Sequence, residues 1–370
     1  MNVPNLAVPH AIDGSTRRQI LKSLAATAAW PIIGGCGEGG GRGGGDSTAV
    51  EPRARPVVVY SALDREFSEP ILDDYTSKTR VKVLPKFDIE STKTVGLTNL
   101  LITESERPRC DLFWNNEILN TLRLKKRGLL QAVDLAAARP FPDAFKDQAR
   151  FWHGFAGRAR VLLVNTSMVP DSERPRSIHD LTDTKWKGKL AIAKPLFGTT
   201  ATQATCLFAA WGPDKARGFF RALKANDVQV VSGNKQSARA VGSGEAVLGL
   251  TDTDDALGEI AEGKPVAVVY LDREPGQLGT LFIPNTLAVI RNAPNPTGAR
   301  ELAEYLLSPA VEAALARGPS GQIPLNPEVT ETPPSPVESP RTVHPMTVDW
   351  EAAVDLWDEA VTFLTAEFGA

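Results

Sequence analysis

The chain has 370 residues, of which 42% are hydrophobic and 23% are charged, and its formal net charge is -3. This composition is typical of a globular protein, and the length suggests two domains or two lobes of one protein. Because both signs of charge are interspersed, nothing indicates a nucleic-acid partner. The three cysteines and four histidines show no spacing typical of a zinc site, and we expect no cofactor.

The N-terminal segment has the pattern of an export signal. Residues 16–22 (TRRQILK) match a twin-arginine motif, and the apolar stretch 24–33 is too short to span a bilayer. The Ile-Gly-Gly-Cys sequence that ends at Cys36 resembles a bacterial lipobox, whose cysteine carries a lipid. We therefore expect residues 1–36 to be a twin-arginine and lipoprotein signal, and 37–55 to be a glycine-rich tether. The protein would then be exported and anchored to a membrane, in the periplasm or on the cell surface.

The next part of the chain alternates β-branched runs with helical patterns. This alternation predicts an α/β fold with a mostly parallel sheet, in which ligands bind beyond the carboxyl ends of the strands. The loops at 61–64, 91–94 and 115–117 are therefore candidate ligand loops. The predicted strands are 57–60, 81–84 and 111–114, and the predicted helices are 66–78, 92–102 and 118–130.

The second half continues the same alternation. An apolar run at 158–165 and a segment at 281–291 look like strands that cross between two parts of the molecule. The proline-rich segment 324–345 is expected to wrap the surface in extended form. Further strands are predicted at 228–231, 246–250 and 266–270, and helices at 214–224, 236–241, 297–307, 309–317 and 350–368.

The stretch 191–211 is the one around which we expect the site to be organised. A short buried strand ends at Lys194-Pro195, because proline cannot serve in a central ladder, and a helix follows. Gly198 permits close approach of a ligand, and Thr199 and Thr200 are residue types that cap helices. An ordinary capped helix is the alternative. A helix N-terminus with free N–H groups attracts anions, which makes this turn a candidate oxyanion site.

Five blocks of sequence resemble the periplasmic binding proteins of ABC importers, in particular the ferric-ion, phosphonate and sugar-phosphate branch. The resemblance covers about residues 56–325, and the order and spacing of the blocks carry it. The blocks are VVVYSALDREFSEPILDDY, DLFWNNEILNTLRLKKRGLL, WKGKLAIAKPLFGTT, GEAVLGLTD and IPNTLAVIRNAPNP.

This resemblance implies a two-lobed periplasmic-binding-protein type 2 fold, each lobe a mixed, mostly parallel sheet flanked by helices. Lobe 1 would hold residues 56–157 plus 285–370, and lobe 2 residues 158–284. Hinge crossings are expected near 157–163 and 283–287. The implied partners are the permease and ATPase subunits of a transporter and a small-molecule or ion ligand, and we expect a monomer.

Residue by residue, the ferric site of the family is only partly present. The positions of its histidine and glutamate fall at Asp64 and Asn116, and its tyrosine pair falls at Thr253 and Asp254. Since no adjacent tyrosines occur anywhere, tight ferric binding by the family's usual ligands is not expected. A tyrosine-poor iron site formed by Asp64, Asp252 and Asp254 remains the alternative.

The main hypothesis is a small anionic solute of the phosphonate or sugar-phosphate type. The turn at residues 198–200 would hold the anion, Trp114 would form an apolar wall, and Asp252 and Asp254 would bind hydroxyls or an amine. The complete predicted ligand set is Ser61, Asp64, Thr92, Thr94, Trp114, Asn115, Asn116, Gly198, Thr199, Thr200, Thr202, Asp252 and Asp254.

An enzyme built on the same fold is the competing class of protein. A cysteine nucleophile would need a histidine partner, and no histidine lies near Cys110 or Cys206 in the sequence. Both thiols are therefore interpreted as buried packing groups, and we expect no catalysis.

Overall fold

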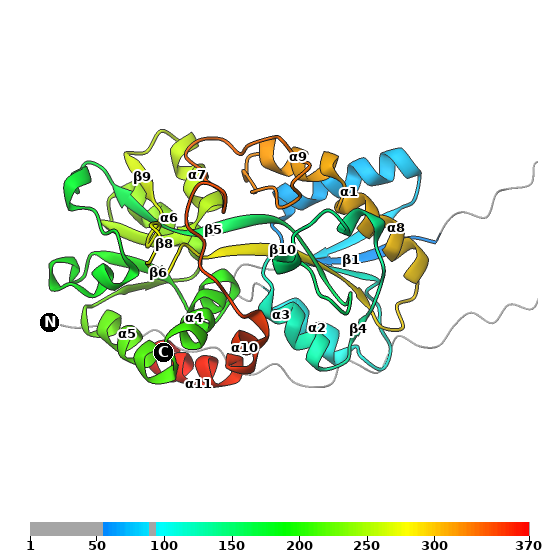
Figure 1. The fold of residues 1–370 in the computed structure, drawn as a ribbon, viewed down its shortest axis with the longest axis horizontal. Helices are drawn as coiled ribbons and strands as arrows, with labels where there is room; N and C mark the ends of the chain where they lie inside the picture. Colours follow the sequence, from blue (N-terminus) through cyan, green and yellow to red (C-terminus); the bar gives the residue numbers. More distant parts are fainter. Residues whose placement is uncertain (1–54, 89–93, 370) are drawn as a thin grey trace, which may run out of the picture. The chain divides into compact units, whose positions relative to one another are not determined.

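The computed structural model of the protein describes residues 55–88 and 94–369 (Figure 1). The export signal with Cys36, most of the tether, and Thr92 lie outside the described residues. No helix of the described part is both long and apolar enough to cross a bilayer. The first elements are β1 (Val57–Ser61), α1 (Arg65–Thr79), β2 (Val83–Phe87), α2 (Val95–Thr103), β3 (Leu112–Asn115), α3 (Leu119–Lys126) and β4 (Leu130–Gln131).

The middle of the chain holds the longest strand and most of the helices that flank it. These elements are β5 (His153–Asn165), β6 (Leu190–Ala193), α4 (Gly198–Trp211), α5 (Pro213–Ala225), β7 (Gln229–Val231), α6 (Asn234–Ser243), β8 (Leu248–Asp252), α7 (Thr253–Ala261) and β9 (Val266–Val269). Short 3-10 turns are η2 (Ala136–Ala138), η3 (Asp143–Phe145), η4 (Asp171–Glu173), η5 (Ile178–Thr182) and η6 (Thr184–Trp186).

The last part of the chain returns through one strand and ends in helices. The elements are β10 (Phe282–Ile290), α8 (Pro296–Leu306), α9 (Pro309–Arg317), α10 (Trp350–Asp355) and α11 (Trp357–Phe368). The prediction of a single helix over 350–368 is wrong in one respect, because the structure has two helices there, separated at Leu356. The break lets α10 pack against α3 and α4 while α11 packs against α4 and α5, two surfaces that one straight helix does not follow.

The strands pair in the order β2-β1-β3-β10-β5-β8-β6-β7, with β4 also on β10 and β9 also on β5. Pairs within β1–β3 and within β6–β8 are parallel, whereas β10 and β5 pair antiparallel with their neighbours. The sheet is therefore mixed, as predicted. Strand β2 includes Pro85 and starts later than predicted, which an edge strand tolerates because proline cannot donate to the ladder.

Strand β5 connects the two groups of parallel strands. Its first half pairs with β10 through residues 153–159, and its second half pairs with β8 and β9 through residues 160–165. It is longer than the predicted strand 158–165 and every one of its residues is buried. A charged side chain on its second half therefore lies inside the protein, where it needs a partner.

Alternating side chains bury both faces of each group of strands. On one face of the first group, Val59 and Trp114 pack with residues of α1, α8 and α9, and on the other face Phe113 packs with α2 and α3. In the second group Leu162 packs with α4, α5 and α11, and Leu163 packs with α6. This alternation is the period of two expected of strands covered by helices on both faces. The predicted lobe boundaries remain a prediction.

Candidate functional site

The candidate site lies where β6 and β8 end and the helices α4 and α7 begin. Gly198 opens α4 with φ of 55°, a left-handed conformation that favours glycine, and no described atom lies within 4 Å of the position that a Cβ would occupy there. The backbone at the start of α4 is therefore open on that side. Thr199 and Thr200, which follow it, are both buried.

A hydrogen-bonded network joins α4 to β8 through Asp252. The Asp252 carboxylate accepts from Arg160 Nη1 at 2.8 Å, from Thr199 Oγ1 at 2.5 Å and from Asn234 Nδ2 at 3.1 Å. Thr200 Oγ1 donates to Asn234 Oδ1 at 2.8 Å. The Arg160 side chain has no exposed area and that of Asp252 is 3% exposed. Such a pair is stable in the interior because each charge is both neutralised and hydrogen-bonded.

A second buried ion pair lies two residues earlier on β5. Arg158 Nη1 and Asp254 Oδ2 are 3.4 Å apart, and Gln322 Nε2 donates to the same carboxylate oxygen at 3.4 Å. Arg158 Nη2 also donates to Asn285 Oδ1 at 3.5 Å. The other oxygen of the same carboxylate, Asp254 Oδ1, accepts from the backbone N–H of Asp255 at 3.1 Å.

Several carboxylates converge on Arg158. Burial by itself lowers the pKa of this guanidinium, but Asp254, Asp252, Asp64 and Asp255 act in the opposite sense, and the pKa ends above its usual value. One carboxylate oxygen from each of Asp252, Asp254 and Asp255 lies within 4.8 Å of the other two. The structure thus brings Asp64 from the loop after β1 toward the aspartates at the start of α7.

The predicted residues of the first strand group take mainly internal roles. Ser61 is buried and its hydroxyl donates to the Leu63 carbonyl at 3.3 Å, while Thr94 Oγ1 accepts from Asn120 Nδ2 at 3.1 Å. Trp114, predicted as a ligand wall, has no exposed area, and its indole N–H donates to Asn285 Oδ1 at 3.4 Å.

The loop after β3 contacts α4 through Glu117. Its carboxylate accepts from Thr202 Oγ1 at 2.9 Å, from Asn115 Nδ2 at 3.0 Å and from the backbone N–H of Leu119 at 2.6 Å. The hydrogen bond between Thr202 and Glu117 therefore joins α4 to the loop after β3. The side-chain oxygens of Asn115 and Asn116 are both buried with no hydrogen-bond partner among the described residues.

The four tyrosines lie away from this cluster. The hydroxyl groups of Tyr60 and Tyr305 donate to Glu104 and Asp74, and that of Tyr270 donates to the Pro336 carbonyl. Burial raises the pKa of Tyr270 to about 12 and also raises the pKa of the other three. The hydroxyl groups of Tyr60, Tyr270 and Tyr305 are therefore engaged with partners outside the aspartate cluster.

Arg158, Arg160 and Asn234 are site residues that the sequence analysis missed. The two arginines stand two positions apart in a run that is otherwise apolar or small, so both point to one face of a strand whose other residues are buried. Charged residues at such positions are a signal for buried partners. Asn234 follows strand β7 and begins α6, a position analogous to the start of α4.

The sequence profile of the bacterial extracellular solute-binding proteins matches residues 114–353. This match covers more than half of the chain, and the protein therefore belongs to that family. It is a solute-binding protein of an ABC importer with the two-lobed type 2 fold, it acts outside the cytoplasm, and it is not an enzyme.

Individual relatives agree with this assignment. The major ferric iron-binding protein of Neisseria meningitidis serogroup B is 24% identical over 328 residues, which are 85% of this chain and 95% of the relative. Iron-bound HitA of Pseudomonas aeruginosa superposes with a TM-score of 0.76 at 18% identity, over 85% of this chain and 99% of HitA. AfuA of Actinobacillus pleuropneumoniae with fructose-6-phosphate superposes with a TM-score of 0.74 at 20% identity. This superposition covers 85% of this chain and 99% of AfuA.

The network around Asp252 leads to a stability prediction. Thr199→Val removes a short hydrogen bond to a buried carboxylate at nearly constant volume. We expect the free energy of unfolding to fall by about 1.5–3 kcal/mol, the usual range for hydrogen bonds to charged groups. Urea unfolding of the ligand-free protein measures the change.

The matched control is Thr205→Val on the same helix. The Thr205 hydroxyl donates at 2.9 Å to the carbonyl of Ala201, a neutral acceptor one turn earlier. Its loss should cost under about 1 kcal/mol. Equal effects of the two substitutions would show that Asp252 does not depend on Thr199.

Proposed function

We propose that this solute-binding protein captures ferric iron between its lobes and delivers it to the permease and ATPase of an importer, as a monomer. The observation that supports this proposal most directly is the cluster of carboxylate oxygens from Asp252, Asp254 and Asp255 at the start of α7. Two of the similar proteins, from Neisseria and Pseudomonas, are described as ferric iron-binding or iron-bound. This agrees with the iron alternative of the sequence analysis rather than with its main hypothesis.

The chemistry of the cluster supports a hard cation. Carboxylate oxygens suit such ions, and no thiol or imidazole of the described residues joins the group. Within it the Asp252 carboxylate accepts hydrogen bonds from the side chains of Arg160, Thr199 and Asn234 and so joins several elements. We assign Asp254 and Asp255 as the principal ligands because their carboxylates lie together at the start of α7, and Asp64 from the loop after β1 as a third. This site uses carboxylates in place of the family's tyrosines.

Replacing two of these ligands tests the assignment. Asp254→Asn combined with Asp255→Asn should weaken ferric binding by more than about a hundredfold, because even residues that only support a metal ligand commonly contribute ten- to a hundredfold. Titration with ferric citrate, followed by competition with a chelator, measures the affinity. Small-angle scattering of the wild type should show compaction on loading, as expected of hinge closure.

Asp214→Asn serves as the control, because this carboxylate is fully exposed on α5 and pairs only with Arg217 among the described residues. It should bind iron like the wild type. Iron binding by the double variant at wild-type affinity would refute the carboxylate site.

A phosphorylated small solute is the second candidate, and specific observations favour it. Arg160 Nη2 and Arg158 Nε are buried nitrogen donors with no hydrogen-bond partner among the described residues. The start of α4, open at Gly198, offers backbone N–H groups on the same side as Arg160, which contacts Thr199. AfuA, which has a similar fold, was solved with fructose-6-phosphate.

Fructose-6-phosphate and inorganic phosphate test this candidate by thermal shift and calorimetry. Arg160→Lys keeps a positive charge beside Asp252 but removes the planar guanidinium, which can donate two parallel hydrogen bonds to a phosphate. If the solute is phosphorylated, this variant should bind it at least about tenfold more weakly, which corresponds to about 1.4 kcal/mol. Arg217→Lys, on the surface of α5, is the control. Absence of any shift with both phosphates in the wild type would exclude this candidate.

We also propose that Cys36 is lipidated and anchors the mature protein to a membrane. The twin-arginine motif, the short apolar stretch and the lipobox-like sequence support this proposal. A diacylglycerol anchor resists salt washing, because two acyl chains hold far more firmly than one. Cys36→Ser should therefore release the protein into the soluble fraction of its host. Unchanged membrane association of this variant, or an unprocessed N-terminus by intact mass, would contradict the anchor.

A further inference from the structure

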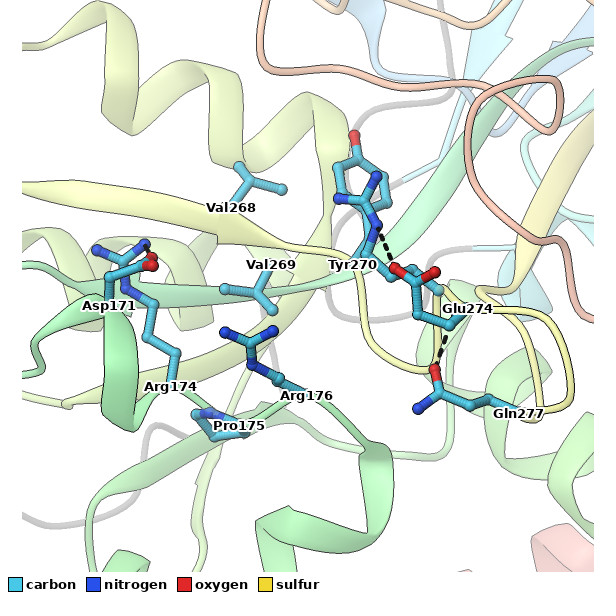
Figure 2. A pocket seen from close by; sticks show the side chains of 10 residues that line it. Asp171, Arg174, Pro175, Arg176, Val268, Val269, Tyr270, Glu274 and Gln277 are labelled. Carbon is cyan, nitrogen blue, oxygen red and sulfur yellow. Dashed lines mark hydrogen bonds and ion pairs between the residues drawn. The ribbon is translucent and has the colours of Figure 1, made fainter.

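A separate cavity of about 240 Å³ lies beside strand β9 (Figure 2). Its lining residues come from the segment around η4 and from β9 and the loop that follows it, and none of them belongs to the site at α4 and α7. Val269 supplies an apolar surface while Val268 lies on the opposite face of β9, and three arginines, Arg174, Arg176 and Arg273, supply positive charge. A cavity that combines these two features is suited to a ligand with an apolar body and an anionic end.

The arginines of this cavity are not equivalent. Arg174 Nη1 lies 2.6 Å from Asp171 Oδ1, and Arg273 Nη1 lies 3.2 Å from Glu338 Oε1. Across residues 55–88 and 94–369, Arg176 forms no side-chain ion pair or hydrogen bond. In Figure 2 its guanidinium projects toward Val269, between Arg174 and Glu274. One guanidinium is thus available at the apolar surface.

The position of Arg176 is fixed by its backbone. Its N–H donates to Asp180 Oδ2 at 2.9 Å, and its carbonyl accepts from the N–H of Asp272 at 2.8 Å. Arg174 also lines the cavity, and its Nε is a buried donor with no partner in the described part of the chain. Two guanidinium donors on a fixed turn suit a planar carboxylate, which accepts from both.

The surrounding carboxylates limit the charge of the ligand. Asp171 and Glu274 line the cavity together with the arginines, so a dianionic phosphate would be repelled by two neighbours of the same sign. A single negative charge matches Arg176, the one arginine lining this cavity that forms no ion pair with the described residues.

We propose that this cavity binds a small aliphatic monocarboxylate, with its carboxylate on Arg176 and Arg174 and its hydrocarbon chain against Val269. This site is additional to the transport site, and its occupancy does not depend on the identity of the transported solute.

Butyrate is the probe, and butyramide, which has nearly the same shape without the charge, is the matched ligand control. Titration followed by amide signals in ¹H–¹⁵N correlation spectra should give saturable shifts at Val269 and Tyr270 with butyrate only. Arg176→Gln should weaken binding at least about tenfold, whereas Arg139→Gln, an equally exposed arginine on the surface beside η2, should not.

The opposite results overturn the proposal. If butyramide gives the same signal shifts as butyrate, or if inorganic phosphate binds more tightly, the ligand is not a monocarboxylate. If the shifts are confined to residues around Gly198, butyrate does not bind in this cavity. Unchanged affinity of Arg176→Gln would exclude the assigned cation. Thermal melting confirms that the variants are folded. Arg174→Lys, which keeps a positive charge beside Asp171 but replaces the whole guanidinium, Nε included, provides a second test with the same expected direction.

Discussion

The buried ion pair between Arg160 and Asp252 is the contact on which the arrangement of the site depends. Arg160 comes from the strand that joins the two strand groups, and Asp252 ends the strand beside it, with Thr199 and Asn234 bound to the same carboxylate. Removing one member of such a pair leaves an uncompensated charge inside the protein, which costs several kcal/mol. The starts of α4, α6 and α7 are therefore held together by a single carboxylate.

This constraint separates the two aspartates of α7 and β8 into different roles. Asp252 already accepts three hydrogen bonds, so a ligand that needed it would first have to break them. Asp254 instead pairs with Arg158 at 3.4 Å and also accepts from Gln322 and from the backbone N–H of Asp255. Beside these pairs, Arg158 Nε and Arg160 Nη2 are buried donors with no hydrogen-bond partner among the described residues.

The fold and the position of the site were largely predictable from the sequence, whereas the contacts were not. Alternating strands and helices predict the sheet, and the rule that ligands bind beyond strand ends leads to Gly198, Asp252 and Asp254, whose role in binding stays a prediction. The pairing of Arg160 with Asp252 joins residues 92 positions apart, and a single sequence contains no distance information for it. The internal roles of Trp114 and Thr202 likewise depend on which face of each element is covered, which only the packed structure decides. The break at Leu356 has the same origin, since the surfaces that α10 and α11 cover are assembled from distant segments.

The two arginines also explain why the missing tyrosines do not settle the nature of the ligand. A tyrosine side chain supplies a hard oxygen donor, but the hydroxyl groups of Tyr60, Tyr270 and Tyr305 are hydrogen-bonded to partners outside the aspartate cluster. Carboxylates supply the same kind of hard oxygen donor. Each carboxylate beside an arginine is, however, already partly neutralised, and a metal ion gains less from it than from an isolated one. The same few residues thus combine carboxylate oxygens with buried guanidinium donors, and the absence of one type of side chain does not by itself decide between a cation and an anion.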